Sequence, residues 1–397
     1  MRSDFMTDFD DIRPYNDSEV APAIARVLAT PELIRAVARL RFPHLSGVLP
    51  WLMRPLVHTY LQHQLRGVNT VDQLQEIIGH YLENMLNRRV SELTVSGLDK
   101  LQKDKAYLFI SNHRDIAMDP AFVNWAMFHY GFDTVRIAIG DNLLTKPYVS
   151  DLIRLNKSFI VKRNISSPRE KLKASKHLSA YIHHSIAEDK SNVWIAQREG
   201  RAKDGRDVTN SAIVSMIALS KPKPQDFGEY IGELNIVPVS ISYEWDPCDA
   251  AKARELHAVQ THGRYEKAEH EDVASIAAGI AGEKGHVHLA FGDVLGSEYE
   301  STEQVAREID RQVWNNYVLH PSNHLAYERL YSKPSGLPVT AKGCEFVAAD
   351  YPEEQRELDR RLAGLLPEQQ QILLSIYANS VVSHLKLAAS AEDAAQE

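Results

Sequence analysis

The sequence has few cysteines and no long apolar run. Among 397 residues only Cys248 and Cys344 are cysteine, which excludes a disulfide framework and gives no metal-ligating spacing. No stretch of about 18 uninterrupted apolar residues occurs, so the sequence predicts no spanning helix. The start, MRSDFMTDFDDI, is acidic where a signal peptide is basic and then apolar. We therefore expect a cytoplasmic protein.

Acidic residues outnumber basic ones, and the formal net charge is −8. This balance argues against a nucleic-acid-binding protein, since a phosphate backbone demands a cationic face. The sign reverses locally, with ten Lys and Arg against three Asp and Glu between Arg136 and Lys176. Such a block is usually a solvated helix face, but it would also attract an anionic substrate or lipid headgroups.

The segment that comes nearest to a spanning helix is SGVLPWLMRPLVHTYL, residues 46–61. It is interrupted by Pro50 and Pro55 and carries Arg54 and His58. Two interpretations stay open, because an amphipathic segment of this kind either lies on a bilayer surface or packs inside the protein.

The periodicity of the chain changes along its length. Residues 18–97 have helical spacing and no convincing strand, and residues 351–390 are again helical. Between them, short apolar runs alternate with amphipathic segments; the runs are AYLFIS, VRIAI, SFIV, NVWIA, NIVPVSISY and HVHLAFG. This alternation predicts an α/β fold, with a central mostly parallel or mixed sheet flanked by helices. We expect a helical N-terminal region at 1–97, an α/β domain at 98–335 and a helical C-terminal segment at 336–397.

The segment YLFISNHRDIAMDPAF is the most informative for chemistry. An apolar strand runs directly into His113, and open α/β sheets place ligands at the carboxyl ends of their strands. Asp119-Pro120 is suited to a helix cap followed by the first helical residue. A histidine at this place can take a proton from a substrate hydroxyl while a carboxylate orients its ring. On spacing alone, a simple helix cap and a polar strand end explain the same residues.

Three further segments place polar groups after strands. Lys162 and Arg163 follow SFIV and are suited to clamping a phosphate, although a solvated pair would look the same. The turn Glu199-Gly200-Arg201 follows NVWIA, and its glycine allows close approach of a ligand. Pro238 interrupts NIVPVSISY, which predicts an edge strand or a bulge.

In this order and at these separations, the four segments resemble the four sequence blocks of the glycerolipid acyltransferase family, over residues 105–296. Asn112-His113-Arg114 with Met118-Asp119 resembles the first block, in which histidine is the base and aspartate orients it. Gly140-Asp141-Asn142-Leu143 with Phe159 to Arg163 resembles the second, in which arginine contacts the acceptor phosphate. The turn Glu199 to Arg201, with Gly205, resembles the third, acceptor-binding block. Ile236 to Val239, which includes Pro238, resembles the fourth, associated with the acyl donor.

Two departures from the family pattern affect the site. The family spacing is H-x-x-x-x-D, whereas five residues separate His113 from Asp119. Either the loop accommodates one more residue and Asp119 keeps its role, or Asp115 replaces it. We favour Asp119, since the family's aspartate also begins a helix. The third block is one residue shorter, because Arg201 follows Glu199-Gly200 at once.

The resemblance implies an enzyme of phospholipid biosynthesis. It would move a fatty acyl group from acyl-CoA or acyl carrier protein to a hydroxyl of glycerol 3-phosphate or a lysophospholipid. His113 and Asp119 would be catalytic, and the substrate-binding residues would be Arg114, Lys162, Arg163, Glu199, Gly200, Arg201 and Pro238. It implies no cofactor, no metal and no nucleic acid, and a peripheral position on the inner face of a membrane. The alternative is a catalytically divergent member that binds lipid or associates with membranes.

His286 and His288 are the one pair that suggests a metal site. Alternate residues of a strand face the same side, but no third ligand is evident in the sequence. We therefore interpret them as structural residues of a strand.

Overall fold

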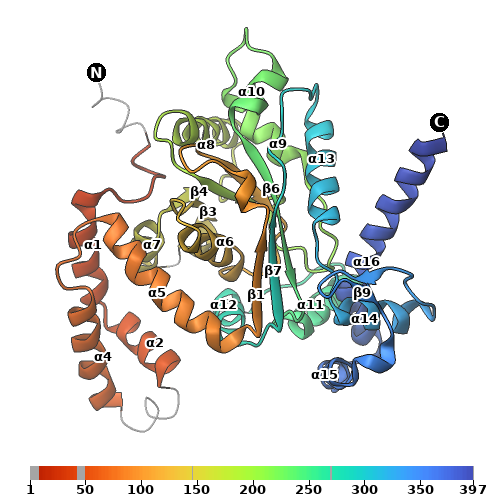
Figure 1. Cartoon of the computed structure of the whole chain (residues 1–397). Coiled ribbons are helices and arrows are strands. Elements are labelled where there is room, and N and C mark those ends of the chain that lie inside the picture. The colour runs from red at the N-terminus through yellow and green to blue at the C-terminus, as the bar shows by residue number, and fades with distance from the viewer. Residues whose placement is uncertain (1–8, 43–49, 145, 269–270, 397) are drawn as a thin grey trace.

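The computed structural model describes residues 9–42, 50–144, 146–268 and 271–396. Its centre is a seven-stranded sheet in the order β1-β7-β6-β2-β5-β3-β4 (Figure 1). The strands are β1 (Glu92–Ser96), β2 (Leu108–Ser111), β3 (Arg136–Gly140), β4 (Ser158–Val161), β5 (Val193–Ala196), β6 (Ile236–Tyr243) and β7 (His286–Phe291). Neighbouring pairs are parallel except β6 with β7, which are antiparallel. The expectation of a mostly parallel or mixed sheet is confirmed.

Helices cover both faces of this sheet. On one face, Leu108 and Ile110 pack with α8 (Pro168–Ala187), α9 (Ser211–Ile217), α10 (Phe227–Glu233) and α13 (Thr302–Asn315). On the other face, Phe109 and Trp194 pack with α6 (Met118–His129) and the end of α5 (Val71–Arg89). Alternate residues of a strand point to opposite faces, so the continuous apolar runs fill both layers.

The N-terminal region is helical but includes one strand. Its helices are α1 (Asp17–Leu28), α2 (Pro31–Arg41), α4 (Pro50–Gln64) and α5, and they lie together on one side of the sheet (Figure 1). The expectation that residues 18–97 contain no strand is wrong, because β1 pairs in parallel with β7. β1 is short and only partly buried, so its identity as a strand depends on a partner almost two hundred residues away.

The C-terminal segment is helical, as the periodicity predicts. It contains α15 (Pro352–Leu362) and α16 (Pro367–Gln396), and a two-stranded pair, β8 (Pro338–Val339) with β9 (Cys344–Glu345), that the sequence did not indicate. The helix α14 (Pro321–Tyr331) precedes this segment. By length and composition, Pro367–Ser390 of α16 is apolar enough to cross a membrane. Leu373, Ile376 and Val381 of this helix are buried in a core shared with α14 and α11 (Asp249–His262), as in the core helix of a globular domain.

The interior position of Pro238 corrects the prediction of an edge strand. β6 lies between β2 and β7, and Pro238 pairs with Ile110 of β2. The antiparallel ladder with β7 begins one residue later, at Val239 opposite Phe291. The Pro238 carbonyl still accepts a hydrogen bond from the Gly292 backbone N–H at 2.8 Å. A proline is tolerated here because the ladder that would need its N–H ends beside it.

Candidate functional site

Four of the polar segments end at the same edge of the sheet. The carboxyl ends of β2, β5, β3 and β4 are neighbours in the sheet order. His113, Glu199 and Arg163 follow β2, β5 and β4 in the sequence, and Gly140 is the last residue of β3. Backbone hydrogen bonds join two of the turns, since the Ala202 N–H donates to the His113 carbonyl at 2.7 Å. The first and third segments therefore form one continuous edge, as expected for an open α/β sheet.

Asp119 is the carboxylate that meets the ring of His113. The His113 Nδ1 lies 2.7 Å from Asp119 Oδ2, and the Asp119 side chain is fully buried while 14% of the His113 side chain is exposed. Asp119 Oδ2 also accepts the backbone N–H of Arg114 at 2.6 Å and of Asp115 at 3.0 Å. Because a carboxylate only accepts, Nδ1 carries the ring proton and Nε2 of the neutral imidazole is left as a base.

Tyr243 completes the environment of Asp119 from β6. Its hydroxyl donates to Asp119 Oδ1 at 2.5 Å. Burial, together with the charge of Asp119, holds the pKa of Tyr243 well above its ordinary value of 10.0. The phenol therefore stays protonated and remains a donor. The sequence analysis missed this residue, because the end of β6 comes next to His113 only through the pairing of β6 with β2.

The Asp115 side chain binds the backbone at the start of α6, in the loop that carries the extra residue of the first segment. Its Oδ1 accepts the backbone N–H of Ala117 at 3.0 Å and of Met118 at 2.9 Å, at the start of α6. Burial and the nearby Asp119 raise the pKa of Asp115. Asp115 thus caps the helix, and the loop bends around the Asp119 carboxylate.

The expected roles of Asp119 and Pro120 at the helix start are therefore corrected. α6 begins at Met118, so Asp119 and Pro120 are its second and third residues rather than the cap and the first residue. Proline fits there because the first helical N–H groups have no partner within the helix. Of the two carboxylates that the sequence left open, the one farther along the chain contacts the imidazole, and the nearer one caps the helix.

Arg114 does not face a substrate. Its guanidinium is buried, and its Nη2 donates to Asp207 Oδ2 at 2.6 Å. The cation also lies over the ring of Tyr317, 5.1 Å from the ring centroid. Burial would lower the pKa of Arg114, but Asp207, Tyr317 and Asp246 together outweigh burial and the pKa is raised. The expectation that Arg114 binds substrate is corrected, since this arrangement makes it an internal ion pair that fixes the loop.

The remaining cations and the glycine turn lie at the surface of this edge. Arg163 Nη1 is 3.7 Å from Glu199 Oε1, and 37% and 71% of these side chains are exposed. A Cβ on Gly140 would lie 2.9 Å from Arg163 Nε, so the absence of a side chain at Gly140 makes room for the guanidinium. Gly200 has a positive φ of 74° and open space where a Cβ would be. The second and third segments thus meet around an open, cationic surface.

Lys162 lies apart from this meeting point. Its ammonium pairs with Asp11 at 2.5 Å, and both side chains are more than two-fifths exposed. Arg201 is half-buried in the turn after Gly200. Lys162 is therefore held by the N-terminal segment, and Arg163 is the cation placed between the second and third segments.

The pair of histidines on β7 is hydrogen-bonded within the sheet. Thr94 Oγ1 of β1 lies 2.7 Å from His286 Nε2 and 2.7 Å from His288 Nδ1. Among the described residues, no group of three His, Cys, Asp or Glu side chains has a geometry suited to a metal ion. The contacts with Thr94 give both rings a structural role.

Comparisons with known proteins agree with this geometry. Residues 92–242 match the family model described as Acyltransferase, which begins at β1 and ends on β6. No curated protein sequence matches the chain. Among solved structures, the 1-acyl-sn-glycerophosphate (LPA) acyltransferase PlsC from Thermotoga maritima is similar over 71% of this chain and 92% of that chain, with 14% sequence identity and a TM-score of 0.37. This structural similarity is too low to support a conclusion about function. Only the match to the family model indicates an acyltransferase.

Proposed function

Because residues 92–242 match the family model described as Acyltransferase, we propose that this chain is a glycerolipid acyltransferase that moves a fatty acyl group from a thioester to a hydroxyl of glycerol 3-phosphate or a lysophospholipid. The donor is acyl-CoA or acyl carrier protein, and the reaction uses no cofactor. The observation that supports this most is the contact of His113 Nδ1 with the buried Asp119 carboxylate. It leaves one ring nitrogen as a base at the edge of the sheet where the polar segments converge.

The reaction balances with His113 as the only proton carrier. Nε2 takes the proton of the acceptor hydroxyl as its oxygen attacks the thioester carbonyl carbon. A carbon–oxygen bond forms, the carbon–sulfur bond breaks, and the thiolate leaves with the proton from the imidazolium. Asp119 stabilises that imidazolium through Nδ1–H, and Tyr243 and two backbone N–H groups hold the carboxylate in place. General-base assistance of this kind contributes roughly a hundred- to ten-thousand-fold.

The acceptor phosphate is assigned to Arg163. Its guanidinium is exposed beside Glu199, and a planar fork of donors is suited to two phosphate oxygens. The ends of β2 and β4 are three strand spacings apart, which is about 14 Å. The Arg163 side chain lies beside Gly140 at the end of β3 and reaches Glu199 in the turn after β5, which shortens this separation. Gly200 and Arg201 lie in the turn after β5 at the same edge, whereas Lys162 is paired with Asp11 of the N-terminal segment.

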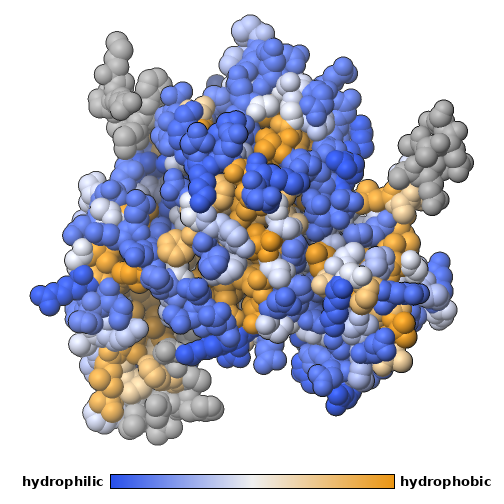
Figure 2. Space-filling model, viewed as in Figure 1, coloured by the Kyte–Doolittle hydropathy of each residue, from blue (hydrophilic) through white to orange (hydrophobic). Residues whose placement is uncertain are grey.

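A membrane-facing surface is assigned to α4. Met53 and Val57 are buried against Ile34 and Ala38 of α2, whereas Trp51, Leu56 and Tyr60 are 71%, 53% and 59% exposed. Apolar side chains are visible over this helix at the lower left of Figure 2. Both interpretations of the segment therefore have support, one for each face of the helix. An exposed aromatic and aliphatic stripe is typical of helices that lie in a bilayer interface, and it would keep the chain on the inner face of the membrane.

The test is to identify the products of the purified chain. The protein is incubated with a mixture of acyl-CoA and acyl carrier protein thioesters and with either glycerol 3-phosphate or a lysophospholipid, and the lipids are analysed by mass spectrometry. A new ester on one acceptor is expected. Binding of lipid without any ester from any donor would favour the divergent, non-catalytic member and would contradict the proposal.

A further inference from the structure

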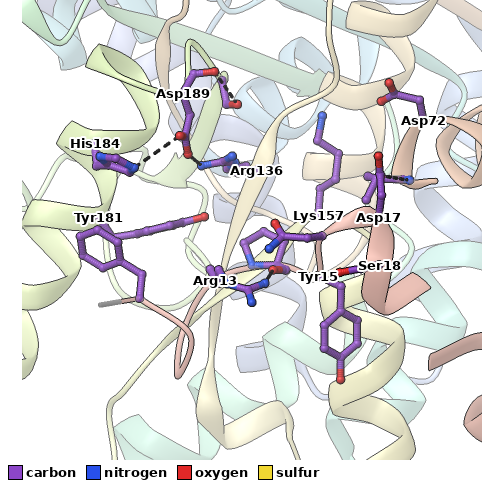
Figure 3. Close-up of a pocket in the computed structure, with 15 residues that line it drawn as sticks. Arg13, Tyr15, Asp17, Ser18, Asp72, Arg136, Lys157, Tyr181, His184 and Asp189 are labelled. Atoms are coloured by element: carbon purple, nitrogen blue, oxygen red, sulfur yellow. Dashed lines mark hydrogen bonds and ion pairs between the residues drawn. The ribbon is translucent and has the colours of Figure 1, made fainter. Parts of the chain in front are cut away.

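A cavity lies at the opposite end of the sheet from His113. It has a volume of about 560 Å³ and is lined by the N-terminal segment, the start of α5, the end of α8 and the residues at the amino ends of β3, β4 and β5 (Figure 3). Cavities of a few hundred cubic ångströms commonly hold small molecules. Arg136 begins β3 and Lys157 precedes β4, so the cavity is separated from the catalytic edge by the length of a strand, on the order of 15 Å.

Lys157 brings a cation without a counter-ion into this cavity. Its Nζ donates to the Thr134 carbonyl at 2.8 Å and to the Thr134 hydroxyl at 2.9 Å. No carboxylate in the described ranges lies within 4.0 Å of it, and Asp133 and Asp72 act on it only from a distance. Burial, with a smaller effect of Arg136, lowers the pKa of Lys157 to about 8. An anion beside this ammonium would replace the solvation that burial removes.

Tyr181 supplies a second unused group. Its side chain is 98% buried, since only 2% is exposed, and its hydroxyl has no hydrogen-bond partner in the part of the chain that the structure describes. Figure 3 shows the hydroxyl end of this ring directed towards the space between Arg136, Lys157 and Arg13. A buried hydroxyl without a partner costs free energy. It therefore marks a position where a ligand atom would be stabilising.

The two arginines and the histidine of the cavity are already paired with carboxylates. Arg136 Nη1 binds Asp189 Oδ2 at 2.6 Å, and His184 contacts the same carboxylate at 3.3 Å. Arg13 binds Glu19 at 2.6 Å. Asp17 accepts the Val71 backbone N–H at 2.8 Å, and Asp72 lines the wall beyond it. Among the lining side chains, the cations of Arg13, Arg136 and Lys157 balance the carboxylates of Asp17, Asp72 and Asp189. Lys157 differs from the two arginines because no carboxylate in the described ranges lies within 4.0 Å of its ammonium.

We infer that this cavity is a binding site for a small oxyanion compound, a phosphate monoester or a carboxylate, whose anionic group contacts Lys157 and which accepts a hydrogen bond from Tyr181. The site is separate from the acyl-transfer edge and belongs to a different ligand molecule. Phe9 and Tyr15 form part of its wall, so the ligand has room for a short carbon skeleton beside its charged group.

The first test measures binding at this place alone. Lys157 is modified with an amine-reactive acetylating reagent near pH 8, and its rate of modification is followed by mass spectrometry in the presence of inorganic phosphate, glycerol 3-phosphate or acetate. An occupied site protects Lys157 and leaves the exposed Lys171 of α8 unaffected. Protection by both phosphate compounds identifies phosphate as the recognised group, and protection by acetate alone identifies a carboxylate. If none of the three slows the modification of Lys157, the inference is wrong.

The second test uses variants in calorimetric titrations with the protecting anion. Lys157→Met should weaken binding at least tenfold, about 1.4 kcal/mol, and Lys157→Arg should restore most of it. Tyr181→Phe should weaken binding several-fold without lowering thermal stability, because the hydroxyl it removes has no partner in the unliganded protein. Lys171→Met is the matched control and should bind as the wild type. Equal affinity in wild type, Lys157→Met and Tyr181→Phe would overturn the inference.

Discussion

Asp119 Oδ2 lies 2.7 Å from His113 Nδ1 although five residues separate the two in the chain. The same oxygen accepts two backbone N–H groups of the intervening loop, and Asp115 closes that loop onto the start of α6. The two carboxylates are thus only four residues apart but have different roles. Replacing each by its amide distinguishes these roles.

Asp119→Asn should lower the rate of acyl transfer by a hundredfold or more, on the order seen when a carboxylate no longer fixes a catalytic imidazole. The amide retains the shape of the side chain but allows the wrong ring tautomer. Asp115→Asn should cost only about 1 kcal/mol of stability, as expected for a weakened helix cap, and should leave the rate within a few-fold of wild type. Steady-state kinetics and thermal unfolding of the two variants check this. The reverse ranking of rates would assign the orienting role to Asp115.

Arg114 and Arg163 should respond in opposite ways to replacement by methionine. Arg114→Met leaves the Asp207 carboxylate buried without its partner, so the free energy of unfolding should fall by about 3–5 kcal/mol. Arg163→Met removes an exposed cation and should change that free energy by less than about 0.5 kcal/mol, while the KM for the phosphate acceptor rises at least tenfold. Urea unfolding and acceptor titrations measure both quantities. An unchanged KM in Arg163→Met would remove Arg163 from the acceptor site.

The exposed stripe of α4 should govern membrane association. Replacing Trp51, Leu56 and Tyr60 together by serine removes apolar side chains that are more than half exposed, so folding should be little affected. Co-sedimentation with vesicles that contain anionic lipid should fall at least tenfold, because each buried apolar group contributes to interfacial binding. Val259→Ser, an exposed apolar residue of α11, is the control. Vesicle binding that is unchanged in the triple variant would place the membrane contact elsewhere.

Acid should destabilise the fold through the histidines of β7. Burial, and then the neighbouring His286, lower the pKa of His288 from its ordinary 6.5 to about 4. The unfolded chain therefore binds more protons than the folded one between these values, so the stabilisation is complete above about pH 6.5 and is lost as the pH falls towards 4. His288→Gln, which retains a polar group for Thr94 and Ser96, should reduce the loss of stability in this window by an amount on the order of 2–3 kcal/mol.

Urea unfolding at pH 7.5 and pH 5 measures that difference. His262→Gln, a change at the exposed end of α11, should leave the pH dependence as in the wild type. A His288→Gln protein as sensitive to acid as the wild type would show that protonation of this ring does not contribute.

The sequence predicted what depends on local pattern. The six apolar runs became β2 to β7 because their residues fill both faces of the sheet, and the position of His113 follows from the end of its strand. Long-range pairing was not predictable in the same way. β1 forms a strand only because it pairs with β7. Tyr243 contacts Asp119 only because of the strand pairing in the sheet. Arg114 is buried in an ion pair with Asp207, which lies ninety-three residues away in the chain.

The cavity that contains Lys157 could not be predicted from sequence patterns, because it also depends on long-range contacts. Lys157 and Tyr181 come from different elements, and the N-terminal segment that closes the cavity is joined to them by contacts such as the Ile160 N–H with the Ile12 carbonyl at 2.9 Å. The block of positive charge between Arg136 and Lys176 contributes residues to both ends of the sheet. Composition indicated an affinity for anions but not its location.

In the proposed reaction, the imidazole of His113 removes the proton of the acceptor hydroxyl. The most direct test of this step is the rate of ester formation by His113→Ala with saturating acyl donor and acceptor, in a protein whose unfolding temperature matches the wild type. Turnover should fall by at least a thousandfold while the donor still binds. Near-wild-type turnover in this variant would contradict it.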